Sequence, residues 1–550
     1  MKGALITFCK NHFLREEFQV QSKRFILCLL VFILVSLASP LLAAAADEAA
    51  APAAAPAATS DPGGTIAGNV KDIPAKEAGK PTLVEIAEAV GHNKISINIV
   101  WTLITGYLVM FMQLGFALVE TGFTRAKNAV HTMGMNIMIY GIAMMAWWVA
   151  GFAIMFGGVG QVSSLGMVAN LNNEVTLSLF GKSFGIIGYK GFCLSGESYD
   201  VSVCTLFLFQ MVFMDTGATI PTGAMAERWK FLAFCVYGLF VGAIMYPIYG
   251  NWVWGGGWLS QLGSNFGLGH GSVDFAGSGV VHMVGGVIAL AGIVVLGPRI
   301  GKFKKDGTPN AIPGHHIPMG VAGALILGFG WFGFNPGSTL SGTDLRIGVI
   351  AVNTMLCSGA GACFAMITMW LKFGKPDLTM SANGFLAGLV AITAPCAFVA
   401  PWAAVLIGVV SGVLVVYSVL FLEKVLKLDD PVGAVSVHGT CGAWGVLALG
   451  LFADGNYGDK WNNVEGTVRG LFFGDGGQFL AQVIDVVVNF CWIFGLSWVI
   501  FKLIDLVIGM RVSPETELTG LDVPEMGAMA YPDFAQARSM RKEEANGHSR

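Results

Sequence analysis

Two histidines in this sequence lie within copies of one short pattern. Segments 274–286 and 430–442 both read Asp-x2-Gly-x3-Val-His-x3-Gly, which puts His282 and His438 at the ninth position. An imidazole gains or loses a proton near neutral pH, so a pair of imidazoles can hold or pass a proton. If each segment opens a helix at its aspartate, the histidine lies about 12 Å along the helix axis. That depth is close to the middle of a hydrocarbon layer about 30 Å thick.

The direction of the two copies decides whether the histidines meet. Each copy opens an apolar stretch, and the basic residues of the flanking loops indicate that the two stretches cross a membrane in opposite directions. His282 and His438 would then approach the midplane from opposite faces, where inverted repeats place transporter substrate sites. A plainer interpretation is also open, in which each aspartate caps its helix and each histidine forms a structural hydrogen bond between helices. Because an ionisable group at that depth is costly, two at matching depth favour a pore.

A second group of residues combines aromatic rings with a hydroxyl. Trp254 precedes three glycines, and segment 331–338 reads Trp-Phe-Gly-Phe-Asn-Pro-Gly-Ser, with Phe334 and Ser338 four positions apart on one helix face. An indole face attracts a cation by roughly 0.5 to 2 kcal/mol. A hydroxyl oxygen accepts hydrogen bonds from a cation that carries protons. Anchoring at the membrane interface and core packing are the alternative interpretations of these rings.

The elements that must position these residues are membrane helices. The chain is 54% hydrophobic and only 12% charged, a composition that excludes a soluble globular enzyme. Its 74 glycines suit helices that pack closely within a membrane. We predict an all-α membrane protein in which two inverted five-helix repeats surround a central pore and an eleventh helix follows. The eleven transmembrane helices are expected at approximately 97–119, 129–156, 201–225, 231–253, 275–297, 316–335, 346–371, 382–400, 402–423, 432–453 and 478–510.

Basic residues predict the orientation of these helices. Alternate loops carry twelve Lys and Arg residues, against five in the loops between them. The excess places the mature N-terminus outside and the tail at 511–550 in the cytoplasm. Residues 1–46 are typical of a secretory signal peptide, with an uncleaved anchor helix as the alternative. Residues 47–95 form an Ala/Pro-rich and polar exported segment before the transmembrane domain at 96–510, and the whole predicts a multi-pass protein of the inner (plasma) membrane.

Other classes of function are not supported by the sequence. We find no basic domain or nucleic-acid-reading motif, and the ten cysteines show no metal-ligand spacing. No nucleophile and base stand at recognisable spacing, so we predict neither an enzyme nor a metal or cofactor site. His315 and His316 fall in a loop that we expect to be cytoplasmic and solvated.

A series of short motifs runs through the predicted spans and loops. In chain order they are Arg125-Ala-Lys-Asn128, Phe209-Gln210, Ala226-Glu227-Arg228, Val253-Trp254-Gly-Gly-Gly257, Asp274-Phe-Ala-Gly277, Trp331-Phe-Gly-Phe334-Asn335, Thr393-Ala-Pro395, Asp429-Asp-Pro431, His438-Gly439 and Gly520-Leu-Asp522. With these motifs, the sequence over about residues 97 to 531 resembles the Amt/Mep/Rh family of ammonium transporters. The presence of both Trp254 and Ser338 favours the Amt branch over Rh.

The resemblance implies a role for each residue at the outer end of the pore. Trp254, Ser338 and Phe213 would form an ammonium recruitment site, by cation–π contact and a hydroxyl acceptor, with Asp274 as its structural support. Phe213 and Phe334 would be a stacked pair that closes the mouth to water and hydrated ions.

Behind this gate, His282 and His438 would line a narrow hydrophobic pore. An ammonium ion cannot cheaply lose its hydration shell there, whereas neutral ammonia can cross while its proton is relayed through the imidazoles. K⁺ has no proton to release and would be rejected. The resemblance also implies a homotrimer with a role in nitrogen metabolism, and a cytoplasmic face that docks P-II-type nitrogen-regulatory proteins in prokaryotes.

Several positions depart from the family pattern. Asp215 puts an acid within the third span, where it is either a cation or proton site beside the gate or a structural partner for a neighbouring helix. Glu120 replaces an aromatic residue near the inner end of the first span, where it either lines the exit or marks the interface. Cys193 and Cys204 lie on the exported side and could form a disulfide, and the tail segment 525–531 lacks the usual histidine.

Three hypotheses of function follow. The first is electrogenic ammonium transport, in which the proton crosses as well as the ammonia. The second is a passive ammonia channel of Rh type. The third is an ammonium sensor that acts through a P-II-type partner.

Overall fold

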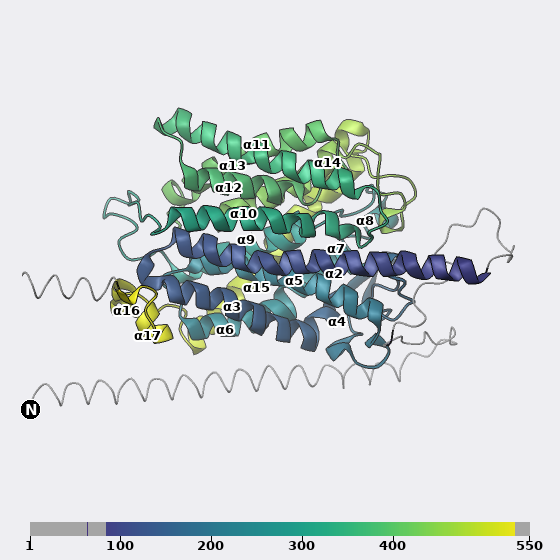
Figure 1. Ribbon diagram of the computed structural model, residues 1–550, viewed down its shortest axis with the longest axis horizontal. Helices are drawn as coiled ribbons and strands as arrows, with labels where there is room; N and C mark the ends of the chain where they lie inside the picture. The colour runs from purple at the N-terminus through teal and green to yellow at the C-terminus, as the bar shows by residue number, and fades with distance from the viewer. Residues whose placement is uncertain (1–62, 64–83, 534–550) are drawn as a thin grey trace, which may run out of the picture.

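The described part of the chain is a bundle of long helices that run roughly side by side (Figure 1). The computed structural model describes residue 63 and residues 84–533. The predicted signal peptide at 1–46, most of the predicted exported segment at 47–95 and the end of the tail lie outside the described residues. The helices confirm the predicted all-α membrane architecture.

Each of the eleven predicted spans has a helical segment at its place in the chain. Within the described residues, ten of these segments are long and apolar enough to cross a membrane, and α12 is shorter. Their bounds are α2 (Val84–Phe123); α3 (Ala129–Ala146), η3 (Trp147–Gly151) and α4 (Phe152–Phe156); α5 (Val201–Met225); α6 (Phe231–Phe240), η7 (Val241–Met245) and α7 (Tyr246–Trp254); η8 (Ser278–Met283) and α9 (Val284–Leu296); α10 (Ile317–Phe334); α11 (Ile347–Phe373); α12 (Leu378–Ile392); α13 (Pro401–Lys424); η10 (Val435–Thr440) and α14 (Cys441–Phe452); and α15 (Gly476–Val507).

Shorter elements connect these helices. They are η2 (Ala126–Asn128), η4 (Ser163–Leu165), β1 (Glu174–Leu179), β2 (Lys182–Gly188), η5 (Phe192–Leu194), η6 (Gly196–Ser198), α8 (Leu262–Phe266), η9 (Pro336–Thr339), η11 (Trp461–Asn463), η12 (Leu471–Phe473), α16 (Pro514–Thr519) and α17 (Asp522–Met526).

Two helices differ from their predicted spans. Helix α2 begins at Val84 rather than near 97, because residues 84–96 contain several good helix formers and no proline. Helix α12 ends at Ile392 rather than near 400. Since Pro395 follows and has no N–H to continue the ladder, the chain leaves the helix there.

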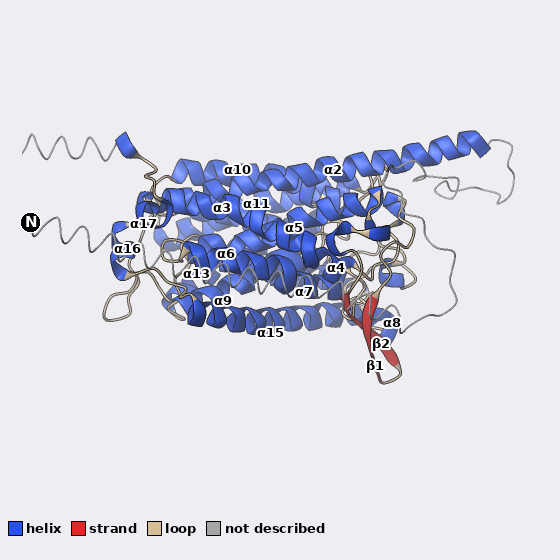
Figure 2. Cartoon of the chain, turned by 90° about the horizontal axis from the view of Figure 1, so that it is seen from below, coloured by secondary structure: helices blue, strands red, loops and turns tan. Residues whose placement is uncertain are grey.

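One end of the bundle, here called the hairpin end, carries a β-hairpin that the sequence analysis did not predict (Figure 2). Strands β1 and β2 pair antiparallel through a turn at Phe180 and Gly181, whose φ angles are +53° and +72°. Two positive φ angles are typical of the tight turns that join twisted strands. The sequence signal for this hairpin was the alternation of polar and apolar residues at 174–179, directly before Phe180 and Gly181.

The opposite end, here called the tail end, carries α16 and α17 (Figure 1). Asp522 of α17 accepts the backbone N–H of His131 at 2.9 Å, and Glu525 accepts that of Phe231 at 2.9 Å. The Lys127 ammonium donates to the carbonyl of Glu517 at 2.7 Å. The described part of the tail is therefore held against the ends of α3 and α6.

The disulfide considered between Cys193 and Cys204 is not formed, because both are free thiols. The Cys193 sulfur lies 3.9 Å from the carbonyl of Val149, whereas Cys204 belongs to the first turn of α5. The two cysteines are thus held by separate segments of the hairpin end.

Candidate functional site

The two predicted histidines meet in the core of the bundle. The Nδ1 atoms of His282 and His438 lie 3.2 Å apart, and the rings stack with centroids 5.3 Å apart. Both side chains are buried. Each belongs to a π-helical turn, η8 or η10, and such turns are rare and often occur at functional sites.

The two helices that carry the histidines run in opposite directions. The start of one packs against the continuation of the other, η8 against α14 and η10 against α9. Gly286 and Gly439 form the crossing point, where a Cβ on Gly286 would collide with the backbone of Gly439. The absence of side chains there brings the two helices close enough for the imidazoles to touch.

The aspartates of the repeated pattern cap these helices, which confirms the plainer interpretation of their role. Asp274 accepts four backbone N–H bonds, at 2.8 to 3.0 Å, from residues 277–280. Asp430 accepts the N–H groups of Gly433 at 3.0 Å and Val435 at 2.8 Å. The expected 12 Å helical rise from aspartate to histidine was wrong, because each helix begins after its aspartate and carries the histidine in its first turns.

A stack of aromatic rings covers His282 on its hairpin side. The rings of Phe213 and Phe334 are stacked with centroids 4.0 Å apart, and both are completely buried. Phe334 in turn stacks on His282 at 5.2 Å, and Trp331 does so at 4.9 Å. These stacked and buried rings fill the space on that side of His282.

Beyond the Phe213 ring lies a cavity of about 160 Å³, here called the vestibule, which Trp254 and Ser338 line. The Trp254 indole stands at an angle of 69° to the Phe213 ring, 6.0 Å away, and donates to the backbone carbonyl of Asp274 at 2.6 Å. Ser338 donates its hydroxyl to the carbonyl of Phe334 at 2.7 Å. Its oxygen therefore keeps lone pairs that can accept a hydrogen bond from a cation.

Gln210 also lines the vestibule, and the sequence analysis quoted it in a motif without giving it a role. Its Oε1 is buried and has no hydrogen-bond partner among the described residues. An unpaired buried acceptor is costly, so it favours a ligand that donates hydrogen bonds.

Asp215 and Glu120, the two acids that depart from the family pattern, occupy different places. Asp215 is buried on α5 with no described partner for Oδ1, but it does not line the vestibule, because two positions separate it from Phe213 and turn it to the far face of the helix. Glu120 is buried and lines a cavity of about 20 Å³ together with His438. The structure therefore places Glu120 in a cavity with His438, whereas Asp215 lines neither this cavity nor the vestibule.

Asp485 of α15 is a further buried acid that sequence reasoning missed. It accepts hydrogen bonds from the Tyr249 hydroxyl and, at 2.6 Å, from the Ser272 hydroxyl. Through Ser272, Asp485 holds the segment that leads into Asp274. An acid within an otherwise apolar span was the available signal.

At the tail end, buried carboxylates pair with arginines of the loops. Arg299 donates Nε and Nη2 to the two oxygens of Asp429 at 2.8 and 2.9 Å, and its Nη1 lies 3.3 Å from Glu227, which also pairs with Arg125. Burial alone would raise the pKa of Asp429, but Arg299 and the charge of Arg228 hold it well below its usual range. This cluster joins four loops at the ends of the helices.

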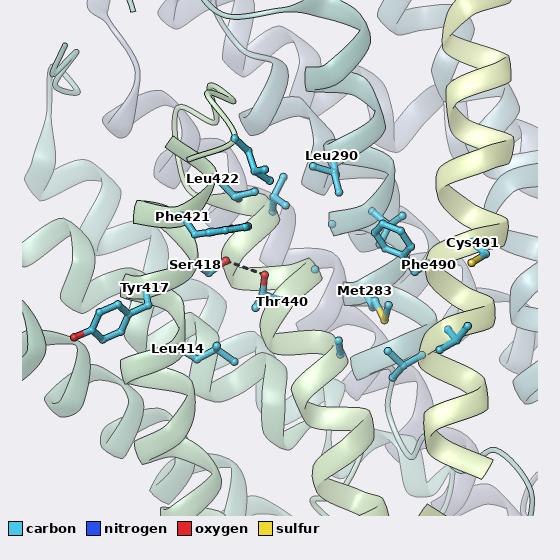
Figure 3. Close-up of a pocket in the computed structure, with 18 residues that line it drawn as sticks. Met283, Leu290, Leu414, Tyr417, Ser418, Phe421, Leu422, Thr440, Phe490 and Cys491 are labelled. Atoms are coloured by element: carbon cyan, nitrogen blue, oxygen red, sulfur yellow. Dashed lines mark hydrogen bonds between the residues drawn. The ribbon is translucent and has the colours of Figure 1, made fainter. Parts of the chain in front are cut away.

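A separate cavity of about 770 Å³ lies between α9, α13, η10 and α15, and neither histidine of the pair lines it (Figure 3). Its lining is almost entirely apolar, and the Ser418 and Thr440 hydroxyls hydrogen-bond to each other at 2.9 Å. None of the residues that line it is charged.

Comparison with known proteins agrees with this arrangement. The model of the Ammonium Transporter Family matches residues 100–531. Ammonium transporter Amt2 of Archaeoglobus fulgidus is 49% identical over 82% of this chain and 91% of its own length. Among solved structures, a protein described as Sensor Amt Protein is 36% identical, with a TM-score of 0.68 over 79% of this chain and 99% of its own. Mep2 of Candida albicans is 26% identical, with a TM-score of 0.65 over 79% of this chain and 90% of its own. The chain belongs to the ammonium transporter family.

Proposed function

We propose that this protein binds ammonium in the vestibule, removes one proton and conducts neutral ammonia past His282 and His438, with the proton relayed separately. The observation that carries the proposal is the unbroken sequence of vestibule, stacked phenylalanines and paired histidines. Each part performs one step of the process on a cation that can lose a proton.

Recruitment depends on the vestibule. The Trp254 ring can attract the cation, and the oxygens of Ser338 and Gln210 can accept its hydrogen bonds. K⁺ would gain the ring attraction, but it has no hydrogen to donate to these acceptors.

Conduction depends on the buried rings. Phe213 and Phe334 leave no room for a hydration shell, so a charged ion would have to cross without one. Ammonia is neutral and small, and it can pass when the rings rotate. The Nε2 atom of His282 is buried and has no hydrogen-bond partner among the described residues, so it can bind the released proton. The Nδ1 contact between the two histidines can then pass a proton from His282 to His438.

We also propose the surroundings in which this happens. The basic loop residues gather at the tail end, which supports a cytoplasmic tail end and an external vestibule. Family membership supports a homotrimer and a tail end that binds a P-II-type regulatory partner.

The test uses proteoliposomes that contain the unmodified protein and a pH-sensitive dye inside. An ammonium step should give a current, and an equal K⁺ step should give none. His282→Ala should lower the ammonium current at least tenfold. His131→Ala is the matched control, because His131 is equally buried but packs against Phe231, away from the pore.

Two results would contradict electrogenic transport. Internal alkalinisation without a current would show a passive ammonia channel. Ammonium binding with neither current nor alkalinisation would favour a sensing role, as in the similar solved structure described as Sensor Amt Protein.

A further inference from the structure

Glu120 is the ionisable side chain that shares a cavity with His438. The cavity of about 20 Å³ is lined by both residues and by the amide of Asn383. That volume holds one water molecule, and a buried water needs two to four polar partners. Imidazole, carboxylate and amide supply them.

Glu120 lies on the far side of His438 from the gate. Phe116 contacts the His438 ring with centroids 6.0 Å apart, and Glu120 follows Phe116 by four positions on α2. The two side chains therefore lie on one helix face, with Glu120 about 6 Å nearer the tail end. His438 turns Nδ1 toward His282, so its Nε2 faces away from His282.

The hydrogen bonds of Glu120 suit both of its protonation states. The Asn136 amide donates to Oε2 at 2.7 Å, and the Thr222 hydroxyl lies 2.8 and 2.7 Å from the two oxygens. The same hydroxyl lies 2.6 Å from the carbonyl of Thr219. When Glu120 is ionised, Thr222 donates to it. When Glu120 is protonated, its O–H can donate to Thr222, which then donates to Thr219.

The carboxylate is not committed to a structural ion pair. In the part of the chain that the structure describes, Glu227 and Asp429 pair with arginines, but neither Lys nor Arg pairs with Glu120. A buried acid that has no cation partner and can be satisfied with or without its proton is suited to exchange that proton.

We propose that Glu120 is the proton acceptor at the inner end of the pore. The proton leaves Nε2 of His438, crosses one water molecule and binds an Oε atom of Glu120, so that His438 becomes neutral as Glu120 becomes a carboxylic acid. Glu120 then gives the proton to bulk water at the tail end and is again a carboxylate. This inference rests on the proposed function, because it assigns the exit of the proton that the histidines relay.

The test separates proton movement from ammonia movement. Proteoliposomes containing the unmodified protein, Glu120→Gln or Glu120→Asp receive an ammonium step, while the current and the internal pH are recorded together. Glu120→Gln keeps the shape and hydrogen bonds of the side chain but cannot take a proton, so we expect at least a tenfold loss of current while internal alkalinisation by ammonia persists. Glu120→Asp keeps a carboxylate and should retain at least a third of the current.

Two further variants serve as a control and as a second test of the role of Glu120. Glu423→Gln is the matched control, because Glu423 is paired with Lys302 outside the pore, and it should leave the current unchanged. Thr222→Val keeps the Glu120 carboxylate but removes the hydroxyl that hydrogen-bonds to its ionised and protonated forms. This variant should lower the current several-fold. Thr222→Val decides the matter if Glu120→Gln does not fold.

Contrary results are distinct from a failure of the proposed function. A current within twofold of normal in Glu120→Gln would overturn the role of Glu120, as would an equal loss in Glu120→Gln and Glu120→Asp. Absence of both current and alkalinisation in the unmodified protein would instead overturn the transport function on which the inference rests.

Discussion

His282 and His438 point their Nδ1 atoms at each other across 3.2 Å, although 156 positions separate them in the chain. Two ring nitrogens at that distance share one hydrogen, so one ring donates and the other accepts. Trp331 and Phe334 stack on His282 and hold its ring in that orientation. The pair therefore lies between the stacked rings of Phe213 and Phe334 and the cavity that His438 shares with Glu120.

Removing the Trp254 ring should weaken ammonium recruitment. A cation–π contact is worth about 0.5 to 2 kcal/mol, so Trp254→Leu should raise the apparent KM for ammonium about 2- to 30-fold with little change in maximal current. The measurement is the concentration dependence of the current. Trp258→Leu is the control, because Trp258 packs on Trp252 instead of the Phe213 ring. An unchanged KM in Trp254→Leu would remove the ring from the recruitment site.

Removing one ring of the gate should open the pore to water. Phe334→Ala deletes the stack on both Phe213 and His282 and should lower the free energy of unfolding by about 3 to 5 kcal/mol. We expect faster water flux in stopped-flow light scattering of proteoliposomes. Phe209→Ala removes a ring that packs at a tilt against Phe213 but leaves the pair of Phe213 and Phe334 in place, so water flux should stay low. Equal water flux in the two variants would argue against the gate.

Adding one methyl group at the helix crossing should separate the histidines. The new Cβ in Gly286→Ala would collide with the backbone of Gly439, which cannot rotate away. Overpacking of this kind costs about 1 to 3 kcal/mol, and the ammonium current should fall with it. Gly359→Ala is the control, because a Cβ there meets nothing within 4 Å. Thermal unfolding and current are measured for both, and a normal current in Gly286→Ala would show that the close crossing is dispensable.

Neutralising Asp429 should destabilise the tail end. Asp429→Asn leaves Arg299 without its main partner, and breaking a buried pair costs about 3 to 5 kcal/mol. Because the pKa of Asp429 is lowered in the folded protein, its contribution is complete above the ordinary aspartate pKa and is lost as the pH falls through the lowered value. The stability difference between the two proteins should therefore be constant from pH 7 to 5 and shrink below about pH 4.

Thermal unfolding in detergent at several pH values measures this difference. Glu465→Gln is the control, because its pair with Lys460 is exposed and an exposed pair contributes about 0 to 1 kcal/mol. A difference between Asp429→Asn and the unmodified protein that grows as the pH falls below 4 would contradict the assigned sign.

The sequence by itself determined the membrane spans and singled out the two histidines that meet in the core. Ten of the eleven expected spans lie at helices long enough to cross a membrane, because a run of apolar residues about 20 long has few other stable structures. The repeated pattern around His282 and His438 could be recognised because few ionisable residues occur within such apolar runs. The hairpin at 174–188 was missed, because its weak alternation lies in a loop outside the membrane.

Only the tertiary structure decided where the buried acids lie. Glu120 and Asp215 look alike in the sequence, as single acids within apolar spans. Packing brings Glu120 into the cavity of His438 and turns Asp215 away from the vestibule. The structure also shows that the helices of His282 and His438 begin after Asp274 and Asp430, because the capping hydrogen bonds of these aspartates fix where the first turn starts. Such contacts join residues far apart in the chain, so no local pattern specifies them.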